Sequence, residues 1–142
     1  DHRTVHFSKL ERAIKQRNFA YFSDAEFKLL LNFGVLRNFA AGSVLIRESQ
    51  EVNRLFLLVE GVVEVTDLNH DNVLLTTGQF VGEMSFLSGN PASASVRVAD
   101  VGCLCLYWMQ SDLVALDRSE PELYKKLHDC FSIDVVQKLK GR

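Results

Sequence analysis

The spacing of apolar residues changes twice along the chain and divides it into three parts. Over residues 1–36 apolar positions recur every three or four residues, which is typical of amphipathic helices. Over residues 37–110 the spacing shortens towards two and β-branched residues concentrate, which predicts strands. Over residues 111–142 helical spacing returns. The pattern therefore predicts N-terminal helices, a β region and C-terminal helices within a single domain, residues 1–142.

Capping residues predict where individual helices begin. Ser23 precedes Glu26 by three residues, and such a pair forms a capping box at a helix start. Pro121 follows a Ser-Glu pair, and proline is favoured in the first turn of a helix. This last helix carries apolar residues at spacings of four, at Leu123, Leu127, Phe131, Val135 and Leu139. We expect the first three of them to face the core.

Six short strands are predicted in the β region, separated by glycines and by a polar turn at residues 69–72. They are Ser43–Arg47, Leu55–Val59, Val62–Leu68, Val73–Thr77, Ser93–Val98 and Leu104–Met109. Many short strands with regular turns favour a small barrel or jelly roll. The expected fold class is α+β, mainly β: an antiparallel double-stranded β-helix, or jelly roll, flanked by N-terminal and C-terminal helices.

Composition narrows the classes of function. The 142 residues carry a net charge of −2, which disfavours a generally basic nucleic-acid-binding protein. No apolar run approaches the roughly 18 residues of a membrane span. The chain begins at Asp1 without an initiator methionine, so we expect it to be part of a longer protein whose effector lies outside this segment.

The chemistry-bearing residues form neither a disulfide scaffold nor a metal site. Cys103 and Cys105 share one face of a predicted strand, whereas Cys130 lies in a helical stretch. No CxxC motif is present, and the four histidines are scattered without metal-ligand spacing. Buried reduced thiols suit a reducing compartment, which predicts the cytoplasm or the cytoplasmic side of a larger membrane protein. We expect no metal or other cofactor.

Three segments of the β region resemble the cyclic nucleotide-binding domain family. Residues 38–48, Asn-Phe-Ala-Ala-Gly-Ser-Val-Leu-Ile-Arg-Glu, are similar to its opening strand, and residues 54–65 are similar to its central hairpin. Residues 78–96 resemble its phosphate-binding cassette, with a Gly-Glu pair followed by a proline at the family's distance, in Gly-Gln-Phe-Val-Gly-Glu-Met-Ser-Phe-Leu-Ser-Gly-Asn-Pro-Ala-Ser-Ala-Ser-Val. The resemblance implies a regulatory domain that senses cAMP or cGMP in signal transduction.

The residue types of the cassette suit recognition of a sugar phosphate. Gly82 permits a sharp turn, and a carboxylate at Glu83 can accept a hydrogen bond from a ribose hydroxyl. A short helix from Glu83 to Leu87 would present its free amides to an anion. Together with the resemblance, this places the expected ligand-binding residues at Gly82, Glu83, Met84, Ser85, Ala92 and Ser93.

Two positions depart from the family pattern. Members of the family follow the cassette proline with an arginine that pairs with the cyclic phosphate, whereas this chain has Ala92. A charge-assisted contact is worth roughly 1.5–3 kcal/mol, so the resemblance implies weakened recognition of cAMP or cGMP. Arg47, Arg54 and Arg97 are the basic residues considered as substitutes. The second departure is Ser49, where the family carries a glycine in a turn.

Three functions stay open at this point. The first is a cyclic-nucleotide-sensing module with a weakened phosphate site. The second is a member of the fold that binds no nucleotide and acts by dimerisation through its C-terminal helix or by contact with another domain. The third is a sensor for a different ligand. An enzyme is not expected, because a β roll of the cupin type needs clustered His and Glu ligands, and no Walker loop is present. No nucleic-acid-binding motif occurs in the segment.

Overall fold

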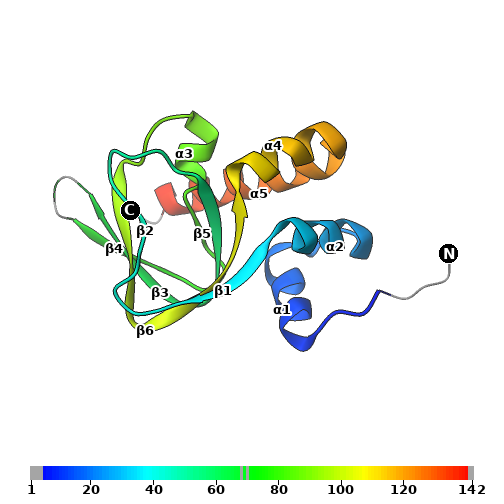
Figure 1. The fold of residues 1–142 in the computed structure, drawn as a ribbon, viewed down its shortest axis with the longest axis horizontal. Helices are drawn as coiled ribbons and strands as arrows, with labels where there is room; N and C mark the ends of the chain where they lie inside the picture. The colour runs from blue at the N-terminus through cyan, green and yellow to red at the C-terminus, as the bar shows by residue number, and fades with distance from the viewer. Residues whose placement is uncertain (1–4, 68, 70, 141–142) are drawn as a thin grey trace.

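The computed structural model describes residues 5–67, 69 and 71–140 (Figure 1). Predictions that fall on residues 1–4, 68, 70 and 141–142 lie outside the described part. The elements along the chain are α1 (Lys9–Asn18), α2 (Asp24–Phe33), β1 (Val35–Phe39), β2 (Val44–Ile46), β3 (Arg54–Asp67), β4 (Asn72–Thr76), β5 (Phe80–Val81), α3 (Glu83–Ser88), β6 (Ala94–Met109), α4 (Gln110–Ser119) and α5 (Pro121–Lys140).

The strands form one antiparallel sheet of six strands that does not close into a barrel. Its main path runs β1-β6-β3-β4, while β2 pairs with β6 and β5 pairs with β3. The long strands β3 and β6 pair along most of their length. Helices flank the sheet, which confirms the predicted mainly β roll (Figure 1).

The predicted strand boundaries were wrong in two respects. β3 and β6 are single continuous strands, where two shorter strands each had been expected. The break predicted between Val59 and Val62 is instead a register shift at Gly61 between the paired strands. The φ of Gly61 is +106°, and a Cβ there would lie 2.6 Å from the carbonyl oxygen of Gly102, so only glycine fits. β1 and β5 were not predicted, and β1 begins at Val35, inside the part expected to be helical.

The N-terminal helices begin where their capping residues place them. Ser23 accepts a hydrogen bond from the Glu26 amide, and the Glu26 carboxylate accepts one from the Ser23 amide, which confirms the predicted capping box of α2. Ser8 and Glu11 form the same reciprocal pair at α1. Each cap satisfies backbone amides that the first helical turn leaves without partners.

A buried core joins the sheet to the helices. Trp108 on β6 is fully buried, and its indole Nε1 donates a hydrogen bond to the Leu30 carbonyl oxygen of α2 at 3.0 Å. Phe19 packs edge-on against Trp108 and Phe80. These contacts place Trp108 and Phe80 in the core.

Helix α5 is anchored to the cassette through aromatic contacts. Leu123, Leu127 and Phe131 are buried, as expected. The Phe131 ring meets Phe80 of β5 at 5.1 Å between centroids and Phe86 of α3 at 5.6 Å, both edge to face. The C-terminal end of α5 therefore lies beside α3, as the red end of the ribbon shows in Figure 1.

The inner face of α5 departs from the spacing of four beyond Phe131. Leu139 is 57% exposed, and the inner face instead carries Asp134 and Lys138. A helix has 3.6 residues per turn, so each step of four residues rotates the stripe by about 40°. After four such steps the stripe that began at Leu123 has turned out of the core.

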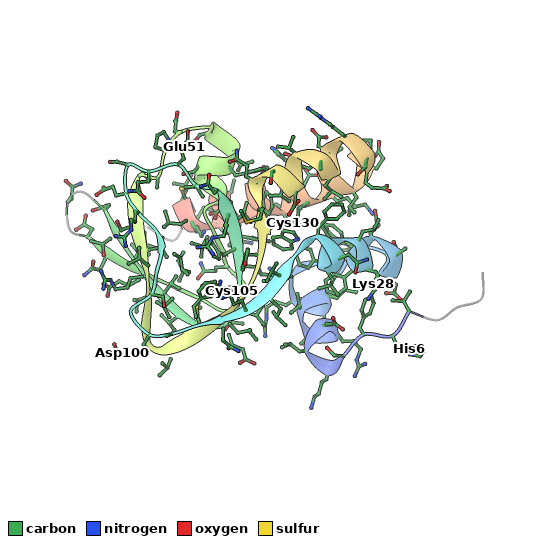
Figure 2. All side chains as sticks on the ribbon, in the orientation of Figure 1. His6, Lys28, Glu51, Asp100, Cys105 and Cys130 are labelled. Carbon is green, nitrogen blue, oxygen red and sulfur yellow. The ribbon has the colours of Figure 1, made fainter. Side chains whose placement is uncertain are left out.

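The cysteines are free thiols. Cys103 and Cys105 lie on the same face of β6 with their sulfurs 3.6 Å apart, whereas Cys130 is half-buried on α5 (Figure 2). Burial raises the pKa of the Cys130 thiol to about 11, which keeps it protonated at neutral pH. Within the described residues, no helix is both long and apolar enough to cross a membrane.

Candidate ligand cavity of the cassette

The cassette begins at a sharp turn between β5 and α3. Gly82 has a φ of +94°, a conformation that side chains other than glycine's rarely adopt. A Cβ at this position would lie 3.2 Å from Ile46 Cδ1 and Val52 Cγ1. Helix α3 follows this loop directly, which confirms the short helix predicted from Glu83 to Leu87. Glu83 lies in the first helical turn, and its side chain is 1% exposed.

The loop after α3 is fixed by backbone hydrogen bonds to the turn that contains Ser49. The Ala92 amide donates to the Gln50 carbonyl oxygen at 2.9 Å, and the Ser49 amide donates to the Ala92 carbonyl oxygen at 2.8 Å. Ser49 has a φ of +69°, in the left-handed region, which explains why the family carries glycine at this turn. These two hydrogen bonds hold the buried Ala92 in place, and Ala92 lines a cavity beside the cassette.

A cavity of about 540 Å³ lies between the cassette, the sheet and the end of α5. Pockets for small ligands in proteins commonly have volumes of about 300–1,000 Å³. All six residues expected to bind ligand line this cavity: Gly82, Glu83, Met84, Ser85, Ala92 and Ser93. Their contact with a ligand stays a prediction, whereas their convergence on one cavity is a feature of the structure.

The cavity wall also holds a basic residue that the sequence analysis had not placed there. Lys138 Nζ of α5 lies 2.5 Å from Glu83 Oε1 and also donates a hydrogen bond to the Phe80 carbonyl oxygen. Asp134, one helical turn earlier on α5, approaches the same ammonium at 2.8 Å. The Lys138 side chain is only 11% exposed, so helix α5 and the cassette meet in a largely buried ion-pair cluster.

The cluster holds a carboxylate in an unfavourable environment. Burial, together with a smaller contribution from the Asp134 carboxylate, raises the pKa of Glu83 to about 7, although the Lys138 ammonium lowers it. Glu83 Oε2 is buried and has no hydrogen-bond partner among the described residues. A buried acceptor without a partner destabilises the fold, because the loss of its hydration is not compensated.

The three arginines considered as substitutes do not line the cavity. Arg47 and Arg97 are exposed. The Arg54 guanidinium stacks over the rings of Phe56 and Tyr107, at 5.1 and 5.2 Å from their centroids. Among the residues that the structure describes, Lys138 is the one basic side chain on the wall.

Lys138 carried a signal that the sequence analysis did not use. Lys138 follows the inward-facing Phe131 by seven residues, which is close to two full turns of helix. A lysine on the inner face of an amphipathic helix is unusual enough to suggest a buried partner.

The remaining polar groups of the cavity include two further carboxylates. Both line the cavity in addition to Glu83: Asp67 is the last residue of β3, and Asp71 lies just before β4. Within the described residues, no group of three or more His, Cys, Asp or Glu side chains is arranged to hold a metal ion. The wall therefore combines several carboxylates, one ammonium and an apolar floor that includes Val65, Val81 and Val96.

Comparison with known proteins assigns the family. The sequence profile described as "Cyclic nucleotide-binding domain" matches residues 36–119, more than half of the chain, and spans the whole cassette. The chain belongs to the cyclic nucleotide-binding domain family.

Individual relatives agree with this assignment. The chain is 40% identical over 84 residues to a cyclic nucleotide-gated potassium channel of Rhizobium etli, an alignment covering 58% of this chain and 23% of the channel. A second such channel, from Mesorhizobium japonicum, is 40% identical over 88 residues, covering 61% of this chain and 24% of that protein. The chain thus spans about a quarter of the length of these channels.

A solved structure shows that the shared fold covers 96% of this chain. The crystal structure of a cyclic nucleotide-binding domain from Methylobacillus flagellatus superposes with a TM-score of 0.79 at 21% identity, covering 96% of this chain and 84% of that one. The coverage includes the helices on both sides of the matched profile, so the fold extends beyond residues 36–119.

Proposed function

We propose that the cavity binds a cyclic nucleotide, cAMP or cGMP, and that the domain is the sensing part of a larger regulatory protein. The observation that carries this proposal is the convergence of six cassette residues on one open cavity of about 540 Å³. The family assignment supports the class of ligand. The free oxygen of Glu83 is suited to a ribose hydroxyl, and the apolar floor is suited to a flat base.

The phosphate is recognised less strongly than in members with a cassette arginine. Ala92 offers no charge where a guanidinium would stand, and the surrounding carboxylates disfavour an anion. We therefore expect weak binding of both cAMP and cGMP, and Ala92→Arg should strengthen it about tenfold or more. Isothermal titration calorimetry on the wild type and the variant measures this directly.

The gain from the arginine should depend on Glu83, whose carboxylate would hold both the ribose and the new guanidinium. Adding Glu83→Ala to Ala92→Arg should remove much of the gain, so the two substitutions are non-additive in a double-mutant cycle. Asn90→Arg is the matched control, because it adds the same charge at an exposed position of the same loop. The proposed function would be contradicted if neither the wild type nor Ala92→Arg bound cAMP or cGMP.

A second candidate function rests on a different surface. Ile133, Val136 and Leu139 of α5 are 58%, 49% and 57% exposed and follow one another at spacings of three. They form an exposed apolar stripe, and such a stripe favours a homodimer through the C-terminal helix or contact with another domain. The two functions are compatible, because the stripe and the cavity lie on different faces of α5. An open cavity argues against a purely structural member of the fold, in which side chains would fill the ligand volume.

The aligned segments cover only 23% and 24% of the two potassium channels, so we assign the effector to sequence outside this segment. The three free thiols and the kinship with channels support a place in the cytoplasm or on the cytoplasmic side of a larger membrane protein. The absence of a catalytic constellation in the cavity wall, among described residues, supports a binding role rather than an enzymatic one.

A further inference from the structure

We propose that Lys138 of helix α5 supplies the positive charge that the cassette lacks, so that the phosphate of the ligand is bound by the C-terminal helix. The inference rests on the proposed function and deepens it by naming the group that recognises the phosphate. The charge would then come from a residue that lies more than 40 positions beyond the cassette in sequence.

The contacts of Lys138 match the electrostatic place of the missing arginine. Its ammonium reaches Glu83, the carboxylate expected to hold the guanidinium of the Ala92→Arg variant. It is largely buried and lies on the wall of the same cavity as Ala92 and Ser93. The ion pair therefore crosses from α5 to the cassette at the point where the cassette itself offers no cation.

One of the three donors of the ammonium can pass to a ligand. Lysine has three N–H donors, and two of them are used by Glu83 Oε1 and the Phe80 carbonyl oxygen. The third neighbour is Asp134, whose Oδ2 forms an ion pair with the ammonium at 2.8 Å. A phosphate oxygen can replace Asp134 at this position without breaking the contact to Glu83.

Because the cation belongs to α5, phosphate binding is coupled to the docking of this helix. A ligand shifts a helix only to the extent that it binds one of its positions more tightly. With an arginine in the cassette, the phosphate charge is satisfied whatever the position of α5. With Lys138, the phosphate is neutralised only when the helix is docked against α3 and β5, as Phe131 holds it here.

The test compares a charged ligand with a neutral one. cAMP and adenosine are titrated by calorimetry into the wild type, Lys138→Gln, Lys138→Arg and Lys140→Gln, the last being an exposed lysine of the same helix. Lys138→Gln should weaken cAMP binding about tenfold to a hundredfold and leave adenosine binding within about twofold. Lys138→Arg should retain most of the cAMP affinity, and Lys140→Gln should be unchanged.

The outcomes separate this inference from the proposed function. If Lys138→Gln binds cAMP as the wild type does, or loses cAMP and adenosine equally, Lys138 is not the phosphate cation although the cavity binds nucleotide. If the wild type binds no cyclic nucleotide but Ala92→Arg does, the cavity accommodates the ligand and Lys138 fails as its cation. If neither binds, the proposed function itself is overturned, and the inference with it.

Discussion

Glu83 shows at the scale of one residue how burial and charge compete in the cavity wall. The Lys138 ammonium lies at hydrogen-bond distance and favours the carboxylate, yet burial outweighs it and raises the pKa to about 7. The carboxylate is thus retained in the folded protein at a cost in stability. This cost is understandable if the group acts on a ligand, since structural roles alone rarely require an unpartnered buried oxygen.

The raised pKa of Glu83 predicts a particular pH dependence of stability. Between its unfolded value of 4.5 and about 7, the folded protein binds more protons than the unfolded chain, so this group lowers stability as the pH rises across that window. Glu83→Gln removes the titration. The free energy of unfolding of Glu83→Gln relative to wild type should therefore rise by up to about 3 kcal/mol from roughly pH 5 to pH 8.

Urea denaturation at several pH values measures the free energy of unfolding of Glu83→Gln relative to wild type. The contributions of most other titrating groups are the same in both proteins and cancel in this difference. Glu26→Gln is the matched control: the Ser23 amide and Lys126 lower the pKa of Glu26, so its stabilising contribution is present above 4.5 and is lost only below it. The relative stability of that variant should stay level across the same window. A level profile for Glu83→Gln would show that Glu83 titrates normally.

Residue chemistry in the cassette was predictable from the sequence, whereas the ion-pair cluster was not. Gly82, Glu83 and Ala92 lie within one short motif of the sequence, so local sequence determines their arrangement. Lys138 approaches Glu83 across 55 positions of the chain, and only the packing of α5 brings the two together. The same reason explains the failure of the arginine candidates, since the aromatic rings around Arg54 meet only through β1, β3 and β6.

Helix α5 is the element that connects the core to the cavity. Its N-terminal half is held by Leu123 and Leu127, its middle by Phe131, and its end by the ion pair of Lys138. Periodicity predicted the first three anchors correctly and then drifted, because a strict spacing of four departs from 3.6 residues per turn. Capping residues likewise predicted α2, while β3 and β6 were divided wrongly at glycines that permit bulges rather than turns.

Removing an anchor of α5 should weaken both folding and ligand binding. Leu127 is fully buried, and Leu127→Ala should lower the free energy of unfolding by about 2–5 kcal/mol through the cavity it leaves. Amide hydrogen exchange in residues 121–140 should then accelerate, and saturating cAMP should slow it again because the ligand favours the docked helix.

Ile133→Ala is the control on the same helix, because Ile133 is exposed and its truncation removes little buried area. Its exchange profile should follow that of the wild type. Exchange in residues 121–140 that is indifferent to saturating ligand in both the wild type and Leu127→Ala would argue against a nucleotide-driven switch in α5.

At the scale of the whole molecule, α5 presents two faces to two different partners. One face packs on the core and ends at the cavity, whereas the opposite face exposes the apolar stripe of Ile133, Val136 and Leu139. Any partner that covers this stripe would also restrain the helix that carries Lys138. Association and ligand binding are therefore expected to influence each other, with the same coupling free energy in both directions.

The stripe predicts self-association that depends on concentration. Sedimentation velocity over a range of protein concentrations should show a monomer–dimer equilibrium for the wild type, because burying three aliphatic side chains on each copy contributes favourably to association. Ile133→Glu should shift the equilibrium towards monomer, since a carboxylate would lose its hydration in the contact. Gln16→Glu, which adds the same charge at an exposed position of α1, should leave it unchanged. A wild type that is monomeric at every concentration would contradict the homodimer and assign the stripe to a different chain segment or partner.

Adding saturating cAMP to the same concentration series tests the coupling between association and ligand binding. A ligand that docks α5 through Lys138 should change the dimerisation constant of the wild type but not that of Lys138→Gln.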